Sequence, residues 1–252
     1  MTTITSNLSR DVLTITLDSP QNRNAISLAL VQELDAALAR IDDLPDLRAV
    51  LLTHTGPTFC AGADLKEAPA NLPARGAHFI SVLDRLGTCP VPVVVAMKGN
   101  ARAGGIGLLG AADIVIAPSD ASFAFTEVRI GVVPAIIGVT VIPRMTARAV
   151  QRYFLTGEDF DAAQAVECGL VTMSVPREEV DARTEAILDT LRLAAPSALR
   201  LTKELIRSRA SRPADHDGLV AAAALSTRAF LSDDGKEGML AFREKRAPRW
   251  VR

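Results

Sequence analysis

Two loops rich in small residues are the parts of this 252-residue chain that could bind a developing negative charge. One contains Ala61, Gly62 and Ala63, and the other contains Gly104 and Gly105 at the start of an apolar stretch. Small residues let a ligand approach the backbone, and a free N–H at a helix N-terminus is a good donor to an oxyanion. Two such donors would suit a reaction that passes through an enolate. Each loop could equally be an ordinary turn or a tight packing point.

Glu127 is a lone carboxylate in the apolar segment FAFTEVRIGVVPA. Burial in such surroundings would raise the pKa of its carboxyl group toward neutrality, which suits a general acid or base. The alternative is a structural ion pair with Arg129 or another arginine. Both interpretations stay open from the residues alone.

Gly105, Gly107 and Gly110 form the pattern G-x-G-x-x-G that is typical of dinucleotide-binding loops, and Glu127 follows near the expected acidic position. That motif requires its first glycine at the end of a strand. We expect the preceding strand to end near Met97, about eight residues too early. The expected position of this strand therefore disfavours a nucleotide-dependent oxidoreductase.

The elements that must position these residues alternate between strand and helix in the first half of the chain. Strands are predicted at 11–17, 48–53 and 113–117 and in a segment that ends near Met97, and helices at 27–41 (with Ser27 as N-cap), at about 74–86 and after the glycine loop. Later helices are predicted at 178–194, 197–209, 217–231 and 235–245, with a linker at 211–217. This order predicts a parallel or mixed α/β core, followed by a helical layer or oligomerisation region.

Composition excludes several classes of protein. The 48% hydrophobic content supports a sizeable core, and 28 Lys+Arg against 29 Asp+Glu gives no global charge for nucleic acid or a membrane surface. No apolar run reaches the ~18 residues of a membrane span, and the N-terminus lacks an apolar signal core. Cys60, Cys89 and Cys168 are too widely spaced for a disulfide framework or a zinc site. We expect a cytoplasmic protein with no metal and no bound cofactor.

Six segments, in order along nearly the whole chain, resemble the enoyl-CoA hydratase/isomerase (crotonase) family. They are SPQNRNAI (19–26), FCAGADL (59–65), GNARAGGIGL (99–108), ASFAFTEVRIGVVPA (121–135), ALRLTKELI (198–206) and GMLAFREKRAPRW (238–250). The resemblance implies an α/β fold of the ClpP/crotonase type, with a spiral of ββα units in residues 1–195. It implies a C-terminal helical trimerisation region in residues 196–252. It also implies an acyl-CoA thioester substrate and a homotrimer or dimer of trimers, while the balanced charge predicts no nucleic-acid or membrane partner.

The resemblance assigns roles to individual residues. The N–H groups of Ala63 and Gly104 would hold the thioester oxygen, and Glu127 would be the catalytic carboxylate. Substrate-binding positions would be Asn22, Arg23, Ala61, Asp64, Leu65, Lys66, Phe242 and Lys245. Phe242 and Lys245 match tail positions that often complete the CoA site of a neighbouring subunit, where a lysine suits a phosphate. Asp64 would cap the oxyanion loop and would not act as a base.

Gly107 departs from the pattern of hydratases with two glutamates, which carry the first glutamate at this position. Glu127 alone could serve a hydratase, as in a branch resembling the enzymes of branched or carboxylated enoyl-CoAs such as methylglutaconyl-CoA. It could equally serve a Δ3-Δ2-enoyl-CoA isomerase, and a non-catalytic acyl-CoA-binding protein is a further alternative. His78 or Glu67 could supply the missing group. The sequence predicts an enoyl-CoA hydratase-like lyase first, with the isomerase as the alternative.

Overall fold

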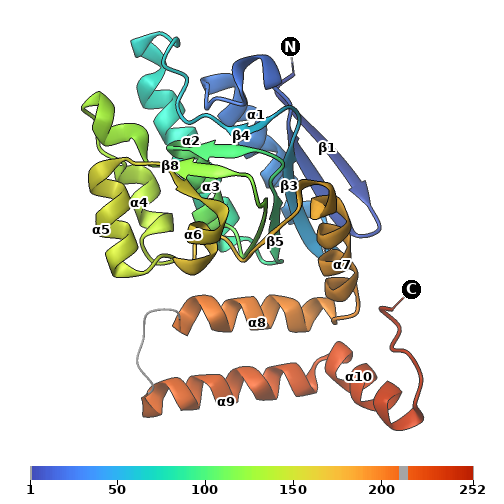
Figure 1. Cartoon of the computed structure of the whole chain (residues 1–252). Helices are drawn as coiled ribbons and strands as arrows, with labels where there is room; N and C mark the ends of the chain where they lie inside the picture. Colours follow the sequence, from blue (N-terminus) through green and yellow to red (C-terminus); the bar gives the residue numbers. More distant parts are fainter. Residues whose placement is uncertain (1, 210–214, 252) are drawn as a thin grey trace.

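The computed structural model describes residues 2–209 and 215–251, which form two β-sheets with helices packed around them (Figure 1). The strands are β1 (Ile4–Ser9), β2 (Val12–Leu17), β3 (Ala49–His54), β4 (Thr58–Cys60), β5 (Val93–Ala96), β6 (Asn100–Arg102), β7 (Ile114–Pro118), β8 (Ser122–Ala124), β9 (Phe160–Asp161) and β10 (Met173–Val175). The α-helices are α1 (Leu28–Ala39), α2 (Leu72–Thr88), α3 (Gly104–Ala111), α4 (Ala135–Val141), α5 (Ala147–Thr156), α6 (Ala162–Glu167), α7 (Val180–Arg192), α8 (Pro196–Arg209), α9 (His216–Leu231) and α10 (Asp233–Glu244).

The two sheets are built from alternating strands of the chain. The six-stranded sheet has the order β1-β2-β3-β5-β7-β10; β1 is antiparallel to β2, and the other pairings are parallel. The four-stranded sheet has the order β4-β6-β8-β9, with β9 antiparallel to β8. The pairs β3–β4, β5–β6 and β7–β8 each leave one strand in each sheet before a helical segment follows. This repeated ββα turn confirms the predicted crotonase-like spiral.

Strand β5 shows why the sheet lies at the centre of the molecule, because its side chains are buried on both faces. Val93 and Val95 belong to the large core cluster beneath α1 and α2, whereas Val94 and Ala96 pack in a second cluster with Val180 of α7. A parallel sheet covered on both faces requires such a continuous apolar strand. The sheet is therefore a rigid support for the loops at its strand ends.

The prediction that no strand ends close to Gly105 was wrong. Strand β6 ends at Arg102, close to Gly104, so a strand does precede the glycines. The glycines nevertheless serve packing within the protein. A Cβ on Gly105 would lie 2.8 Å from the Cys60 carbonyl oxygen, and one on Gly110 would lie 2.8 Å from the Thr140 carbonyl oxygen. Helix α3 is thus pressed against other backbone where a nucleotide loop would need open space.

Helices α8, α9 and α10 form a layer beside the core (Figure 1). Lys203 of α8 ties this layer to the sheet, because its Nζ donates to Asp113 Oδ2 (2.6 Å) and to the Val91 carbonyl oxygen (2.9 Å). Most of the predicted linker at 211–217 lies outside the described residues; Asp215 caps α9 through Gly218 N (2.6 Å). The division at residue 195 and the role of this layer in trimer contacts stay predictions.

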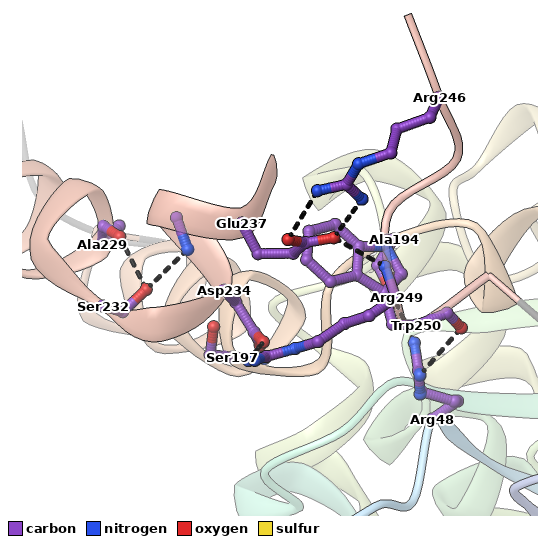
Figure 2. Close-up of polar contacts among 11 residues, drawn as sticks. Arg48, Ala194, Ser197, Ala229, Ser232, Asp234, Glu237, Arg246, Arg249 and Trp250 are labelled. Carbon is purple, nitrogen blue, oxygen red and sulfur yellow. Dashed lines mark hydrogen bonds and ion pairs between the residues drawn. The ribbon is translucent and has the colours of Figure 1, made fainter. Parts of the chain in front are cut away.

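The C-terminal tail folds back from α10 onto the core (Figure 2). Glu237 accepts two hydrogen bonds from the Arg246 guanidinium, at 2.7 and 3.0 Å, and a third from Arg249 N at 2.9 Å. Arg48, at the edge of β3, donates to the Ala194 carbonyl oxygen (2.7 Å) and to the Trp250 carbonyl oxygen (3.2 Å). The Glu237 bonds hold the tail to α10, and the Arg48 bond to Trp250 connects the tail to the six-stranded sheet.

Several structural properties bear on the function classes considered above. Within the described ranges, no helix combines the length and apolar character that crossing a bilayer requires. The same residues contain no group of three or more His, Cys, Asp or Glu side chains suited to a metal ion. Cys60, Cys89 and Cys168 are free and buried. Burial raises the pKa of the Cys60 thiol to about 12, so it is not a ready nucleophile.

Candidate active site

A cleft of about 610 Å³ is lined by both small-residue loops and by Glu127. Its boundaries are residues 61–65, one face of α2, the start of α3 and residues 126–137. The side chains that line the cleft are mostly apolar, and Arg75 and Glu127 are the charged residues among the described ones that line it. Such a cleft suits an acyl chain with a reacting group at one end.

The backbone around Ala63 leaves its amide free to face the cleft. Gly62 O accepts from Ile26 N (2.7 Å), and Asp64 N donates to Ile26 O (3.0 Å). In an extended backbone, alternate residues point their N–H groups to opposite sides, so the Ala63 N–H faces away from Ile26. In the part of the chain that the structure describes, this amide has no hydrogen-bond acceptor.

The Gly104 amide lies on the neighbouring loop, which packs directly against the first. A Cβ built on Gly62 would be 2.7 Å from Ala103 Cβ and 3.6 Å from Gly104 N, and Gly62 has φ +85°. Gly104 is the first residue of α3, so its N–H has no acceptor within the helix. Ala103 has φ 48°, an uncommon conformation for a residue with a side chain. This turn sets the direction in which α3 begins, and the residues that carry the two amides, Ala63 and Gly104, line the same cleft.

Glu127 lies on the 3₁₀ helix η4 (Thr126–Ile130), which follows β8. Its Oε2 atom is buried and has no hydrogen-bond partner among the described residues. Arg129 donates instead to the Thr156 carbonyl oxygen (3.2 Å), so the alternative of an ion pair between Glu127 and Arg129 does not hold. Desolvation by burial raises the pKa of Glu127 above its usual value. A buried carboxylate oxygen without a partner is uncommon in a folded protein, and here the side chain that carries it lines a cleft.

The predicted substrate-binding residues fall into three places. Ala61 and Leu65 line the cleft. Asn22, Arg23, Asp64 and Lys66 lie beside it on two paired segments: Asn22 Nδ2 donates to Asp64 Oδ2 (2.9 Å), Lys66 N donates to Asp64 Oδ1 (2.9 Å), and Ala61 N donates to Arg23 O (3.1 Å). Phe242 and Lys245 lie on α10 and its C-cap, away from the cleft lining of the same chain, and Phe242 is 86% exposed.

Neither His78 nor Glu67 is placed to supply a second catalytic group. His78 Nδ1 lies 3.2 Å from Asp35 Oδ2, where α2 packs on α1. Both carboxylate oxygens of Glu67 are engaged, one by Leu28 N (2.9 Å) and the other by Arg75 Nη1 (3.1 Å). Arg75 lines the cleft and bonds to Asp64 of the loop that carries Ala63. It was not predicted from the sequence, because a single arginine in an amphipathic helix gives no signal of its own.

The position of Gly107 is closed by a neighbouring helix. A Cβ on Gly107 would lie 2.5 Å from Ile137 Cγ2 and 3.0 Å from Ile137 Cβ. Ile137 of α4 is itself buried in the core. A carboxylate at residue 107 would therefore require Ile137 to move, and Glu127 is the one acidic side chain among the described residues that line the cleft.

Known proteins match this chain over nearly its full length. The family model described as enoyl-CoA hydratase/isomerase matches residues 7–252. The chain belongs to the enoyl-CoA hydratase/isomerase family. Among its relatives, a Mycobacterium bovis protein named "Probable enoyl-CoA hydratase echA8" is 35% identical over 241 residues, covering 94% of this chain and 93% of that protein. A Proteus mirabilis carnitinyl-CoA dehydratase is 35% identical over 248 residues, covering 95% and 94%.

A solved structure agrees with the family assignment. The crystal structure of an enoyl-CoA hydratase from Mycobacterium smegmatis superposes with a TM-score of 0.92 at 27% sequence identity, and the match covers 99% of both chains. The fold and the family of this chain are therefore shown.

Proposed function

We propose that this member of the family is an enoyl-CoA hydratase-like lyase, which adds water to a 2-enoyl-CoA thioester. The observation that carries the proposal is the unpartnered Oε2 of Glu127 on a residue that lines the same cleft as Ala63 and Gly104, whose amides are free. The names of two relatives, a hydratase and a dehydratase, support water addition or removal on a CoA thioester.

In the proposed mechanism, the substrate carbonyl oxygen accepts hydrogen bonds from Ala63 N–H and Gly104 N–H. The Glu127 carboxylate takes a proton from water as the water oxygen bonds to the β-carbon, and the π electrons move to the thioester oxygen. The protonated Glu127 then returns the proton to the α-carbon, which restores both the thioester and the carboxylate. Loss of one oxyanion donor typically costs ~2.7–4 kcal/mol of barrier, so backbone amides alone can contribute strongly.

The proposed substrate path runs from the cleft along residues 61–66. Ala61, Leu65 and the exposed Lys66 would contact the pantetheine and adenine, and Arg23 would contact the phosphates. The exposed Phe242 and Lys245 would reach the site of a neighbouring subunit in a homotrimer or dimer of trimers. This assignment follows the family resemblance, and it is supported by the absence of both residues from the cleft lining of their own chain.

A Δ3-Δ2-enoyl-CoA isomerase is the second candidate, and the closed position of Gly107 favours it. With Ile137 in that space, Glu127 is the acidic group available at the described cleft wall. Isomerisation needs one carboxylate, which takes a proton from the α-carbon and returns it to the γ-carbon. The same two amides would hold the dienolate oxygen.

A panel of acyl-CoA substrates separates these functions. Purified protein is incubated with crotonyl-CoA, longer 2-enoyl-CoAs and the corresponding 3-enoyl-CoAs, and the conjugated thioester absorbance is followed. Loss of absorbance from a 2-enoyl-CoA, with a 3-hydroxyacyl-CoA product, is the expected result. A gain of absorbance from 3-enoyl-CoAs alone would replace the hydratase by the isomerase. Binding without turnover across the panel would indicate an acyl-CoA-binding protein.

A further inference from the structure

Arg75 connects the wall of the cleft to the loop that carries the Ala63 amide. It lies on the face of α2 that borders the cleft, together with Leu72, Gly76 and Phe79, at the spacing of one helical face. Its side chain is only 12% exposed, although its neighbours on this wall are mostly apolar. A charged group so placed requires a partner, and its partners lie on the oxyanion loop.

The hydrogen bonds of Arg75 go to Asp64, which follows Ala63 in the chain, and to Glu67, three residues further along. Arg75 Nη1 donates to the Asp64 carbonyl oxygen (2.9 Å) and to Glu67 Oε2 (3.1 Å). The other oxygen of Glu67 accepts from Leu28 N (2.9 Å) at the start of α1, and the Glu67 side chain is 13% exposed. One buried ion pair thus joins α1, α2 and the oxyanion loop.

Every backbone and side-chain polar group of Asp64 makes a hydrogen bond. Its N–H donates to Ile26 O, its carbonyl accepts from Arg75, and its two carboxylate oxygens accept from Asn22 and Lys66 N, all at 2.9–3.0 Å. Because Asp64 is bonded directly to Ala63, its orientation fixes the peptide plane next to the proposed oxyanion donor. The Asp64 carbonyl also accepts from Glu67 N (3.4 Å). The contact with Arg75 comes from α2, whereas the others come from within the two paired loops.

We infer that Arg75 and Glu67 are positioning residues that align the Ala63 N–H with the thioester oxygen and couple this alignment to the acyl wall formed by α2. This inference rests on the proposed function, since it assigns these residues to the same oxyanion site. Neither residue touches the reacting atoms. Alignment is sensitive to such supports, because a shift of about 1 Å at a reacting centre can cost about 100-fold in rate.

The test compares Arg75→Gln with Arg85→Gln, a matched change on the same helix. Arg85 pairs with Asp35 at 2.9 Å, away from the cleft lining. Arg75→Gln is expected to lower kcat about 10- to 100-fold with a smaller change in KM, because an oxyanion donor acts mainly in the transition state. Arg75→Lys, which keeps the charge and several donors, should recover part of the loss. Arg85→Gln should leave kcat within about twofold.

A second readout does not depend on turnover. Butyryl-CoA labelled with ¹³C at the thioester carbonyl is bound to each variant, and the C=O stretching frequency is recorded by infrared difference spectroscopy. Hydrogen bonding in the wild type should lower this frequency, and Arg75→Gln should return it toward the free value while Arg85→Gln does not. Equal frequencies in the wild type and Arg75→Gln, or an effect on unfolding free energy alone, would overturn the inference.

The spectroscopic result also separates this inference from the proposed function. A lowered frequency in the wild type that depends on Arg75, with no turnover of any enoyl-CoA, would overturn the hydratase proposal and leave the positioning role intact. A wild-type frequency equal to that of free butyryl-CoA would overturn the oxyanion assignment and the positioning role together.

Discussion

Glu127 is held where the apolar surroundings of the cleft disfavour its charge, and this has a consequence for pH dependence. Burial raises the pKa of its carboxyl group above the ordinary 4.5, and the proposed mechanism needs the carboxylate as base. Activity should therefore fall as the pH drops through this raised pKa. We expect the midpoint of the acidic limb of kcat/KM to lie above pH 4.5.

The control for this profile is the folded state itself. Circular dichroism at each pH, together with recovery of the rate on return to pH 7.5, distinguishes titration from acid unfolding. An acidic limb with its midpoint at or below pH 4.5 would contradict the raised pKa of Glu127.

Gly107 gives a second prediction at the scale of a single residue. Gly107→Ala places a methyl group 2.5 Å from Ile137 Cγ2, and overpacking of this kind typically costs ~1–3 kcal/mol of unfolding free energy. The matched control is Gly87→Ala in α2, where no atom lies within 4 Å of the new Cβ. That control should be neutral or stabilise by up to ~1 kcal/mol, because alanine is the better helix former. Urea denaturation of both variants measures the difference, and equal stabilities would show that the space at Gly107 is open.

Residue types predicted part of the site and missed the rest for a physical reason. Ala63, Gly104 and Glu127 stood out because small residues and a lone carboxylate in apolar segments are locally unusual, and in the structure all three line the same cleft. The pairing of Arg75 with Glu67 could not be predicted, because it depends on how α2 packs across the loop. The packing of α2 on α1 likewise directs His78 toward Asp35, and the packing of α4 on α3 fills the space at Gly107 with Ile137.

At the scale of elements, length decided what the sequence could predict. The predicted strands at 11–17, 48–53 and 113–117 agree with β2, β3 and β7, and Ser27 does cap α1, accepting from Leu30 N at 3.2 Å. Strands β4, β6 and β8 have three residues each, which is too few to show an alternating pattern, and they were missed. Strand β1 was missed as well, because five of its six residues are exposed at a sheet edge.

His54, at the end of β3, makes the stability of this element depend on pH. The ring is 4% exposed, its Nε2 accepts from Lys98 N (2.7 Å), and burial lowers its pKa below 6.5. The unfolded chain therefore binds a proton more readily than the folded one. The free energy of unfolding should fall as the pH drops below about 6.5, with a slope of at most ~1.4 kcal/mol per pH unit from this residue.

Urea denaturation between pH 5.5 and 8 measures this dependence in the wild type and in His54→Gln. The variant should be less stable at pH 8 and should lose part of the decline toward pH 5.5. Identical pH dependence in the two proteins would show that His54 does not carry the effect.

At the scale of the whole molecule, Arg48 links the six-stranded sheet to the C-terminal tail. Its guanidinium donates to the carbonyl oxygens of Ala194 and Trp250, on either side of the helical layer in sequence (Figure 2). Arg48→Met should leave these partners unsatisfied and cost ~1–3 kcal/mol of unfolding free energy. The tail should also become more accessible to protease than in the wild type.

Arg40→Met is the matched control, since Arg40 bonds to Ser6 Oγ (2.7 Å) at the exposed surface. It should change stability by less than about 0.5 kcal/mol and leave the cleavage rate of the tail unaltered. If Arg48→Met behaved like this control, the tail would be held mainly by the Glu237–Arg246 and Asp234–Arg249 pairs.

The most direct test of the proposed chemistry is the rate of crotonyl-CoA hydration by the wild type and by Glu127→Gln, measured as loss of the conjugated thioester absorbance. Glutamine keeps the size of the side chain and removes its ability to carry a proton, so binding should persist. We expect kcat to fall by about 100-fold or more, the usual contribution of a general acid–base. Full activity of Glu127→Gln would contradict the central role of this carboxylate.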